Sequence, residues 1–296
     1  MILITGGMGF IGNSLIQELS KRNIPFRLLI NPGQIPPTFP REKDIQVAIS
    51  SMDDERGMRA AMKGIETVYH LSENERLDAF GNLDIVDVDS MGSLTNAALY
   101  QNVRRFYYLS QIGADRASGF YLLKAKGIAE NRLRSSGLNY TVFRTSMIFG
   151  EGDLFTGQLA KLINKFPFFI PVPGDGNVLL QPLWVQDLVT ALTWSLGMPV
   201  LENQVVEIGG PEHMSFMEIL KKIQRALNIK KKFLEFNPVK NGFLIQIIEA
   251  IVKGFPKANF WTDYLAENRT CDLDSMPRIF NLNPARLHTK LDYLIK

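Results

Sequence analysis

Four glycines near the start of the chain have the spacing of a phosphate-binding loop. Residues 2–12 read Ile-Leu-Ile-Thr-Gly-Gly-Met-Gly-Phe-Ile-Gly, which fits both G-x-x-G-x-x-G and G-x-G-x-x-G. Such glycines let the chain turn after a strand, let the backbone approach a pyrophosphate and let the next helix pack closely. The helix N-terminus then offers free N–H groups to the phosphates. The predicted nucleotide contacts of this loop are Gly6, Gly7, Met8, Gly9, Phe10, Ile11 and Gly12.

Residues at the ends of later strands are candidates for the rest of the nucleotide. Asn31 ends the second predicted strand, where an acid would bind the NAD ribose and an arginine would bind the NADP phosphate. Asn31 is neither, so the cofactor is predicted to be NAD or NADP without a choice between them. Ser51 and Met52, which follow the third predicted strand, are either contacts of the nucleotide or ordinary loop residues. The candidates beyond Asn31 are Ser51, Met52, Leu71, Ser72 and Arg144.

The elements that must position these residues alternate between apolar strands and amphipathic helices. This alternation is typical of a parallel sheet covered by helices on both faces. It predicts an α/β fold, a Rossmann-type doubly wound parallel sheet with a smaller C-terminal lobe. Ligands bind such sheets at the carboxyl ends of the strands. The predicted domains are residues 1–150 with returning segments at about 178–210 for nucleotide binding, and residues 151–177 and 211–296 for the C-terminal substrate or interaction lobe.

Composition excludes several classes of function. The 296 residues include one cysteine, Cys271, and three separated histidines, so neither a disulfide framework nor a metal site is predicted. A formal charge of +3 does not suggest nucleic-acid binding. The start of the chain lacks the pattern of a signal peptide, and no uncharged apolar run reaches the length of a membrane span. We therefore expect a cytoplasmic protein.

Further motifs carry a family resemblance. The opening glycine loop, together with the segments named below, resembles the extended and atypical short-chain dehydrogenase/reductases. Within that family, the chain resembles the subgroup typified by the NAD(P)H-binding accessory subunit of respiratory complex I. The resemblance implies a nucleotide-binding fold with a C-terminal substrate lobe. The matching segments span most of the chain: 5–12, 108–115, 124–130, 143–153, 181–189 and 207–211.

The catalytic motif of this family is incomplete here. Active members have Tyr-x-x-x-Lys on one helix, so that the lysine lowers the tyrosine pKa and holds the nicotinamide ribose, with a serine or threonine nearby. Four residues before Lys124 the chain has Phe120, which cannot exchange a proton. Tyr121 is either the proton donor in a shifted register or a packing aromatic, and Lys124 is either the ribose ligand or an exposed helix lysine. Ser110 is the candidate hydroxyl, whereas Ile112 stands where many active relatives carry theirs.

Three functions remain open from the sequence. The first is an NAD(P)-dependent reductase of a small apolar carbonyl or quinone-like substrate. The alternatives are a non-catalytic NAD(P)H-binding structural, assembly or redox-sensing protein, and a nucleotide-sugar epimerase or dehydratase. The apolar segment 242–255 is accompanied by lysines, which fits either a helix on a membrane surface or protein partner, or a helix buried in the lobe. The sequence fixes neither the substrate nor the oligomeric state.

Overall fold

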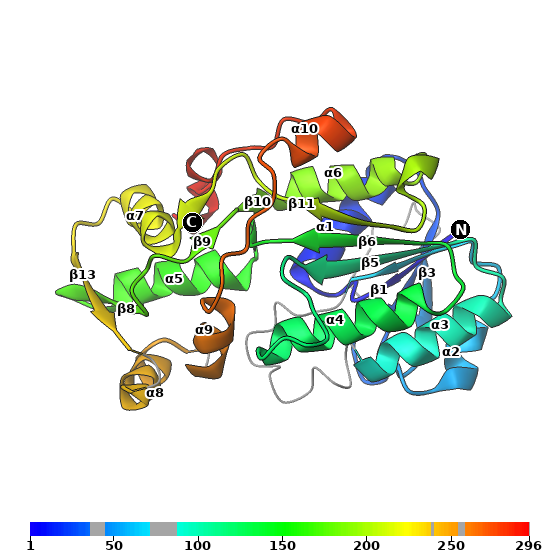
Figure 1. Ribbon diagram of the computed structural model, residues 1–296, viewed down its shortest axis with the longest axis horizontal. Helices are drawn as coiled ribbons and strands as arrows, with labels where there is room; N and C mark the ends of the chain where they lie inside the picture. The colour runs from blue at the N-terminus through cyan, green and yellow to red at the C-terminus, as the bar shows by residue number, and fades with distance from the viewer. Residues whose placement is uncertain (36–44, 72–87, 238–239, 254–257, 296) are drawn as a thin grey trace.

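The computed structural model describes residues 1–35, 45–71, 88–237, 240–253 and 258–295. A large parallel sheet with helices on both faces forms one part of the molecule, and a smaller lobe lies beyond its end (Figure 1). Ser72 lies outside the described residues, so the prediction for it has no structural test.

The central sheet has seven parallel strands in the order β11-β6-β5-β4-β1-β2-β3. Strand β1 lies between β2 and β4, so the chain reverses direction across the sheet at β1, which is the point where doubly wound sheets bind ligands. The predicted fold class is confirmed. Its strands are β1 (Ile2–Thr5), β2 (Phe26–Ile30), β3 (Gln46–Ile49), β4 (Thr67–His70), β5 (Arg105–Gln111), β6 (Tyr140–Thr145) and β11 (Gln204–Ile208).

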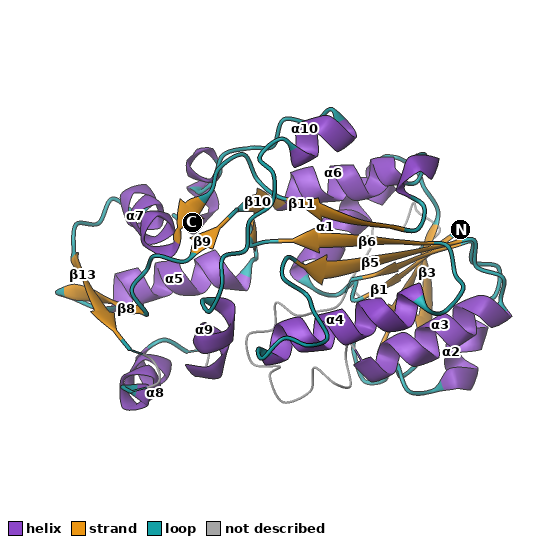
Figure 2. Ribbon diagram, in the orientation of Figure 1, coloured by secondary structure: helices purple, strands orange, loops and turns teal. Residues whose placement is uncertain are grey.

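Two sets of helices cover the sheet, because the central strands are buried on both faces and need an apolar layer on each. One face packs against α1 and α6, and the other packs against α2, α3 and α4 (Figures 1 and 2). The helices of this part are α1 (Phe10–Lys21), α2 (Glu55–Ala61), α3 (Ser90–Tyr100), α4 (Tyr121–Arg134) and α6 (Val185–Ser195).

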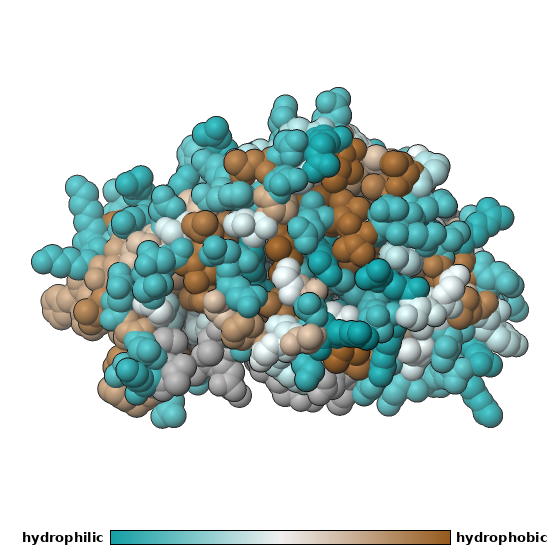
Figure 3. All heavy atoms as spheres, in the orientation of Figure 1, coloured by the Kyte–Doolittle hydropathy of each residue, from teal (hydrophilic) through white to brown (hydrophobic). Residues whose placement is uncertain are grey.

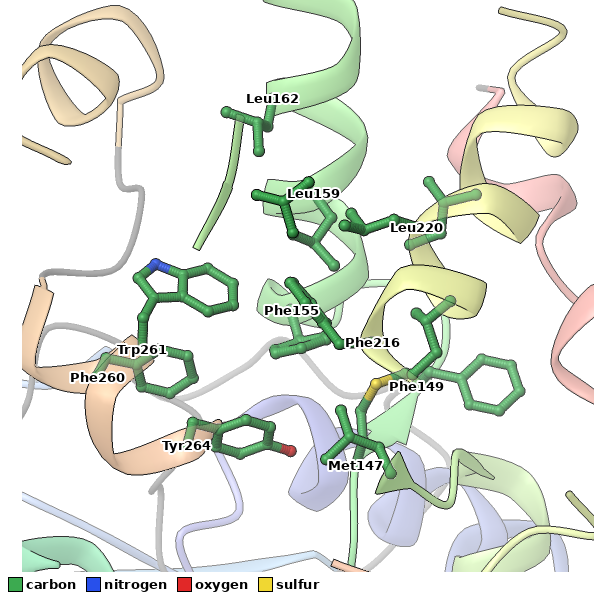
Figure 4. Close-up of a cluster of buried hydrophobic side chains, with 14 of the residues drawn as sticks. Met147, Phe149, Phe155, Leu159, Leu162, Phe216, Leu220, Phe260, Trp261 and Tyr264 are labelled. Atoms are coloured by element: carbon green, nitrogen blue, oxygen red, sulfur yellow. The ribbon is translucent and has the colours of Figure 1, made fainter. Parts of the chain in front are cut away.

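The C-terminal lobe has its own apolar core. Trp261, Phe155 and Phe216 form a cluster of aromatic rings with centroids 5.6–6.2 Å apart (Figure 4). Three two-stranded pairs complete the lobe: β7 (Ile148–Phe149) with β10 (Leu183–Trp184), β9 (Leu179–Leu180) with β12 (Met214–Ser215), and β8 (Phe169–Pro173) with β13 (Lys232–Phe236). Its helices are α5 (Leu154–Lys165), α7 (Phe216–Ala226), α8 (Gly242–Ile251) and α9 (Ala258–Tyr264).

The chain crosses between the two parts more than once. After the first lobe segment it returns to form α6 and β11, and β11 pairs with β6 in the main sheet. Near its end the short helix α10 (Ser275–Phe280) places Met276 and Phe280 in the core of the sheet domain. The proposed domain boundaries stay a prediction. None of the described helices is long and apolar enough to cross a membrane, and the cytoplasmic location stays a prediction as well.

Candidate functional site

The loop between β1 and α1 is built from close backbone approaches. Gly6 has a φ of +72°, and a Cβ there would lie less than 3.0 Å from the carbonyl oxygen of Leu71 at the end of β4. A Cβ on Gly12 would meet the backbone of Gly7 at a similarly short distance. Any side chain at Gly6 or Gly12 would therefore push apart the strand ends and the helix that shape the loop.

The start of α1 is open to a ligand. Gly9 is the N-cap residue and has no side chain to accept from the first-turn N–H groups, and no acidic residue lies in that turn. These N–H groups and the positive end of the helix dipole border a cavity of about 440 Å³. The cavity is lined by Gly6, Met8, Gly9, Phe10, Ile11, Gly12, Asn13, Ser14, Gln17, Gln34, Leu71, Glu151, Gly152 and Leu154.

The other predicted nucleotide contacts lie elsewhere. A Cβ on Gly7 would meet the Leu28 side chain, so Gly7 serves the packing of the loop on the sheet. Asn31, Ser51 and Met52 are not among the residues that line the cavity. Asn31 is exposed, and its N–H donates to the side-chain oxygen of Gln34 at 3.0 Å. At the end of β2 it is thus Gln34 that reaches the cavity, a residue that the sequence did not single out.

A second, smaller cavity of about 50 Å³ lies where β5 and β6 end. Ile11 and Leu154 line both cavities, so the two adjoin each other. The second cavity also contacts Ser110 and Lys126 on one side and the C-terminal lobe on the other. Its remaining lining is Leu109, Gln111, Thr145, Ser146, Met147, Ile148, Asp153, Phe155, Phe260 and Tyr264.

Helix α4 directs Lys126 inward and Lys124 outward. Lys126 is 1% exposed, its Nζ donates to the carbonyl oxygen of Leu109 at 3.1 Å, and it lies 4.9 Å from the centroid of the Tyr108 ring. Lys124 is exposed and lines neither cavity. Because i and i+4 share a helix face, the residue paired with Lys126 is Leu122, which is buried. Lys126 and Leu122 thus form an inward-facing i, i+4 pair of α4, and the ribose contact predicted for Lys124 stays a prediction.

Ser110 and Arg144 belong to one buried network centred on Glu130. Ser110 Oγ donates to Glu130 Oε1 at 2.5 Å, and Arg144 forms two hydrogen bonds with the same carboxylate, at 2.7 and 2.9 Å. These bonds to Glu130 raise the pKa of Arg144. Arg144 also contacts Glu207 at 3.5 Å and the carbonyl oxygen of Ala114. The guanidinium is fully engaged away from both cavities, so the structure gives Arg144 a role in holding Glu130 and not in contacting a nucleotide.

The lobe contributes an apolar wall with one hydroxyl. Phe155 from α5 and Tyr264 from α9 have ring centroids 5.2 Å apart, and Figure 4 shows the Tyr264 hydroxyl directed toward Met147. Tyr264 lines the second cavity, whereas Tyr121 does not. Tyr121 begins α4, and its backbone N–H donates to Asp263 at 3.1 Å.

Arg269 fixes the position of Tyr264. Its guanidinium is buried and donates to the carbonyl oxygens of Asp263 and Tyr264 and to the side chain of Gln111 at the end of β5. Burial lowers the pKa of Arg269. An arginine that binds the last carbonyls of a helix stabilises its C-terminus, and here it also ties α9 to the main sheet.

Asp153 is the buried carboxylate of the second cavity. It accepts hydrogen bonds from the Gly150 and Thr156 N–H groups, from the Thr156 hydroxyl and from the Tyr293 hydroxyl. Burial raises its pKa, and these hydrogen bonds oppose the rise. With four donors already bound, Asp153 serves as the N-cap of α5 and as an anchor for the end of the chain.

Comparison with known proteins agrees with this geometry. A family model described as NAD(P)H-binding matches residues 6–159, just over half of the chain. The chain belongs to this NAD(P)H-binding family. The expected resemblance to atypical short-chain dehydrogenase/reductases and to the complex I subunit is confirmed by the relatives that follow.

Several relatives match most of this NAD(P)H-binding chain. It is 26% identical to the mitochondrial NADH dehydrogenase (ubiquinone) 1 alpha subcomplex subunit 9 of Dictyostelium discoideum, over 88% of this chain and 73% of that one. It is 22% identical to photosystem II assembly factor Ycf39 of Trieres chinensis, over 90% of this chain and 80% of that one. Among solved structures, this chain is similar to an NADPH-dependent quinone oxidoreductase of Escherichia coli complexed with NADPH. The similarity has a TM-score of 0.75 and 17% identity, and it covers the whole of both chains. A nucleoside-diphosphate-sugar epimerase of Staphylococcus aureus has a TM-score of 0.79 and 16% identity, over 100% of this chain and 99% of that one. At these identities the solved structures show the fold alone.

A dinucleotide fits the residues of this NAD(P)H-binding site. The glycine loop leaves room only for backbone, the uncapped α1 faces a cavity of about 440 Å³, and that cavity continues toward Lys126. The glycine loop would allow the backbone to approach a pyrophosphate, and the start of α1 would bind its negative charge. Among the described residues that line the cavity, none is an acid at the end of β2 for an NAD ribose or an arginine there for an NADP phosphate.

Proposed function

We propose that this NAD(P)H-binding protein is a reductase of a small apolar carbonyl or quinone-like substrate. The observation that carries the proposal is the junction of the two cavities at Ile11 and Leu154. One cavity has the features of a dinucleotide site, and the other joins Lys126 to the aromatic wall of the lobe. The aromatic side chains Phe155, Phe260 and Tyr264 of that wall favour a substrate with an apolar body, and the polar side chains opposite them would orient it.

The side chains of the second cavity have different roles in this proposal. Lys126 binds the nicotinamide ribose, because it is the buried cation of the second cavity. The Ser110 hydroxyl donates a hydrogen bond to Glu130, so a lone pair of its oxygen remains to accept a hydrogen bond from the ribose or from Lys126. Tyr264 donates the proton to the substrate oxygen, a role for which Tyr121 is poorly placed. NADH or NADPH held in the larger cavity would supply the hydride. Phe155 and Met147 exclude water from the reacting groups.

Two lysines on α4 provide the test. Removing a charge-assisted hydrogen bond to the ribose costs a factor of about ten to a hundred in affinity. We therefore expect Lys126→Met to weaken NADH or NADPH binding by that factor in calorimetric titration, whereas Lys124→Met changes it by less than about twofold. Equal effects of the two substitutions would contradict the assignment.

A second function is favoured by Leu122. Because the position four residues before Lys126 carries no hydroxyl, the protein lacks the family's usual proton donor, which supports a nucleotide held as a structural, assembly or sensing element. Incubation with a panel of aldehydes, ketones and quinones, followed by the loss of reduced-nicotinamide absorbance, separates the two functions. Turnover of any substrate supports the reductase, and unchanged nucleotide across the panel supports the holding role.

A sugar-nucleotide reaction is supported less well. Epimerases and dehydratases of this family need the same tyrosine that Leu122 replaces. The wall formed by Phe155, Phe260 and Tyr264 is also aromatic, whereas a sugar presents hydroxyls that require polar partners. UDP-glucose and related compounds are tested apart from that panel, with the sugar products separated by chromatography, because an epimerase or dehydratase regenerates its nucleotide and leaves the nicotinamide absorbance unchanged.

A further inference from the structure

Helix α8 is apolar on two opposite sides. Ile245, Ile248 and Val252 are 1–2% exposed and belong to the core of the lobe. Phe243 and Ile247, four residues apart on another face, are 58% and 47% exposed, and Ile251 continues the same stripe. A helix that is apolar all round is normally buried all round. In α8 one stripe anchors the helix and the other faces outward.

The outward face carries no charge, and lysines lie at both of its ends. Gln246 and Ala250 are the other exposed residues of α8, and its single acid, Glu249, is half-buried. Lys240 precedes the helix and Lys253 follows it, both exposed. Over residues 230–253 the sequence has five lysines and two glutamates. An uncharged apolar stripe bordered by lysines is the pattern of a helix that lies in a membrane interface.

A second set of exposed apolar side chains belongs to the same end of the molecule. Phe168 lies just before β8 and is 82% exposed, and Leu234 on the paired strand β13 is exposed as well. Hydrophobic atoms are visible at the end of the lobe formed by β8, β13 and α8 (Figure 3). Lys232 pairs with Phe169 across these strands and is also exposed, so basic and apolar groups alternate here too.

We propose that this end of the lobe docks on an anionic lipid bilayer, with the Phe243, Ile247 and Ile251 stripe inserted among the lipids. Lys240 and Lys253 would then contact the lipid phosphates. A second copy of the chain fits the surface less well, because a two-fold contact through α8 would bring the lysines of both copies together.

Vesicle sedimentation tests the docking directly. The whole protein is mixed with vesicles of phosphatidylcholine alone, or with vesicles in which a third of the lipid is phosphatidylglycerol, at low and at high salt. We expect binding to the anionic vesicles at low salt, and weakening by about fivefold for each lysine whose contact is screened. Absence of binding to the anionic vesicles at low salt overturns the proposal.

Substitutions then locate the contact. Ile247→Glu is expected to reduce partitioning at least about tenfold, because it places a charge on the inserted stripe. Val200→Glu, at an exposed apolar position of the sheet domain, is the control and should leave partitioning unchanged. Circular dichroism and the thermal midpoint check that both variants fold. Unaltered vesicle binding by the folded Ile247→Glu variant overturns the proposal. A wild-type dimer in sedimentation velocity also overturns it if Ile247→Glu dissociates that dimer.

Discussion

The two adjoining cavities are built in different ways. Most of the residues that line the larger one come from one continuous stretch of chain, Gly6 to Gln17, in which Gly6 and Gly12 leave no room for a side chain. The smaller one is shaped by side chains from segments as far apart as Leu109 and Tyr264. The difference teaches that the loop of the larger cavity is encoded locally, whereas the smaller cavity depends on tertiary contacts. Each cavity should therefore respond to a different kind of substitution.

The largest effect is expected at the glycine loop. Gly6→Ala adds a Cβ that meets the Leu71 carbonyl oxygen, at a φ of +72° that disfavours any side chain. Overpacking and the left-handed backbone together cost about 3–5 kcal/mol of the free energy of unfolding. We expect that loss in urea titrations, together with no measurable NAD(P)H binding by calorimetry.

Gly64→Ala is the matched control for this prediction. Gly64 has nearly the same φ, +76°, but nothing lies within 4 Å of where its Cβ would be. Only the backbone contribution remains, about 1–2 kcal/mol, and nucleotide affinity should not change. Similar losses for both variants would mean that the close approach at Gly6 does not shape the loop.

The next effect is expected behind the smaller cavity. Glu130→Gln removes a buried carboxylate that binds both Ser110 and Arg144, and Arg144 keeps only its weaker contacts. Breaking a buried ion pair in this way costs about 3 kcal/mol. The shift of the urea midpoint measures this loss in the free energy of unfolding. Glu207→Gln, which removes the longer and more exposed partner of Arg144, should cost less than about 1 kcal/mol.

The contrast between the cavities also explains what the sequence could predict. The glycine spacing and the alternation of strands and helices are local patterns, and they were sufficient for the doubly wound sheet and for the loop. The lysine of α4 needed one more step. The family resemblance points to Lys124, whereas the buried positions 122, 125, 126, 129 and 133 follow a helical stripe that includes Lys126. That stripe is visible in the sequence and would have marked Lys126 as the inward residue.

Other parts of the site had no local signal. Tyr264 reaches the cavity because Arg269 binds the end of α9 and Gln111 at once, a contact between residues more than 150 positions apart. The structure likewise pairs Arg144 with Glu130, whereas its place at a strand end suggested a nucleotide contact. Side chains that meet only through tertiary packing cannot be paired from a single sequence.

The third prediction concerns the hydroxyl of the smaller cavity. If the reductase assignment holds, Tyr264→Phe removes the proton donor and lowers kcat by about a hundredfold, with little change in nucleotide affinity. Tyr121→Phe is the matched control and should leave kcat within about twofold. Reduced-nicotinamide absorbance under saturating substrate measures both. A larger loss for Tyr121→Phe would return the catalytic role to α4.

The smallest effect is expected far from both cavities, in the capping box that begins α7. The Ser215 side chain accepts from the Glu218 N–H, and the Glu218 carboxylate accepts from the Ser215 N–H at 2.8 Å. That backbone hydrogen bond lowers the pKa of Glu218. The ionised carboxylate therefore stabilises the fold above its unfolded pKa of about 4.5, and the stabilisation is lost as pH falls through the lower folded value.

The lobe should therefore lose stability in acid through this box. Ser215→Ala removes one half of the box and is expected to cost about 1 kcal/mol at neutral pH. Glu218→Gln should lower the urea midpoint at neutral pH and narrow the gap between neutral and acidic midpoints, because it removes one titrating group that the native state holds ionised. Nucleotide affinity should remain unchanged in both variants, since α7 lines neither cavity. A fall in that affinity would show that the two halves of the molecule are coupled more tightly than their separate construction suggests.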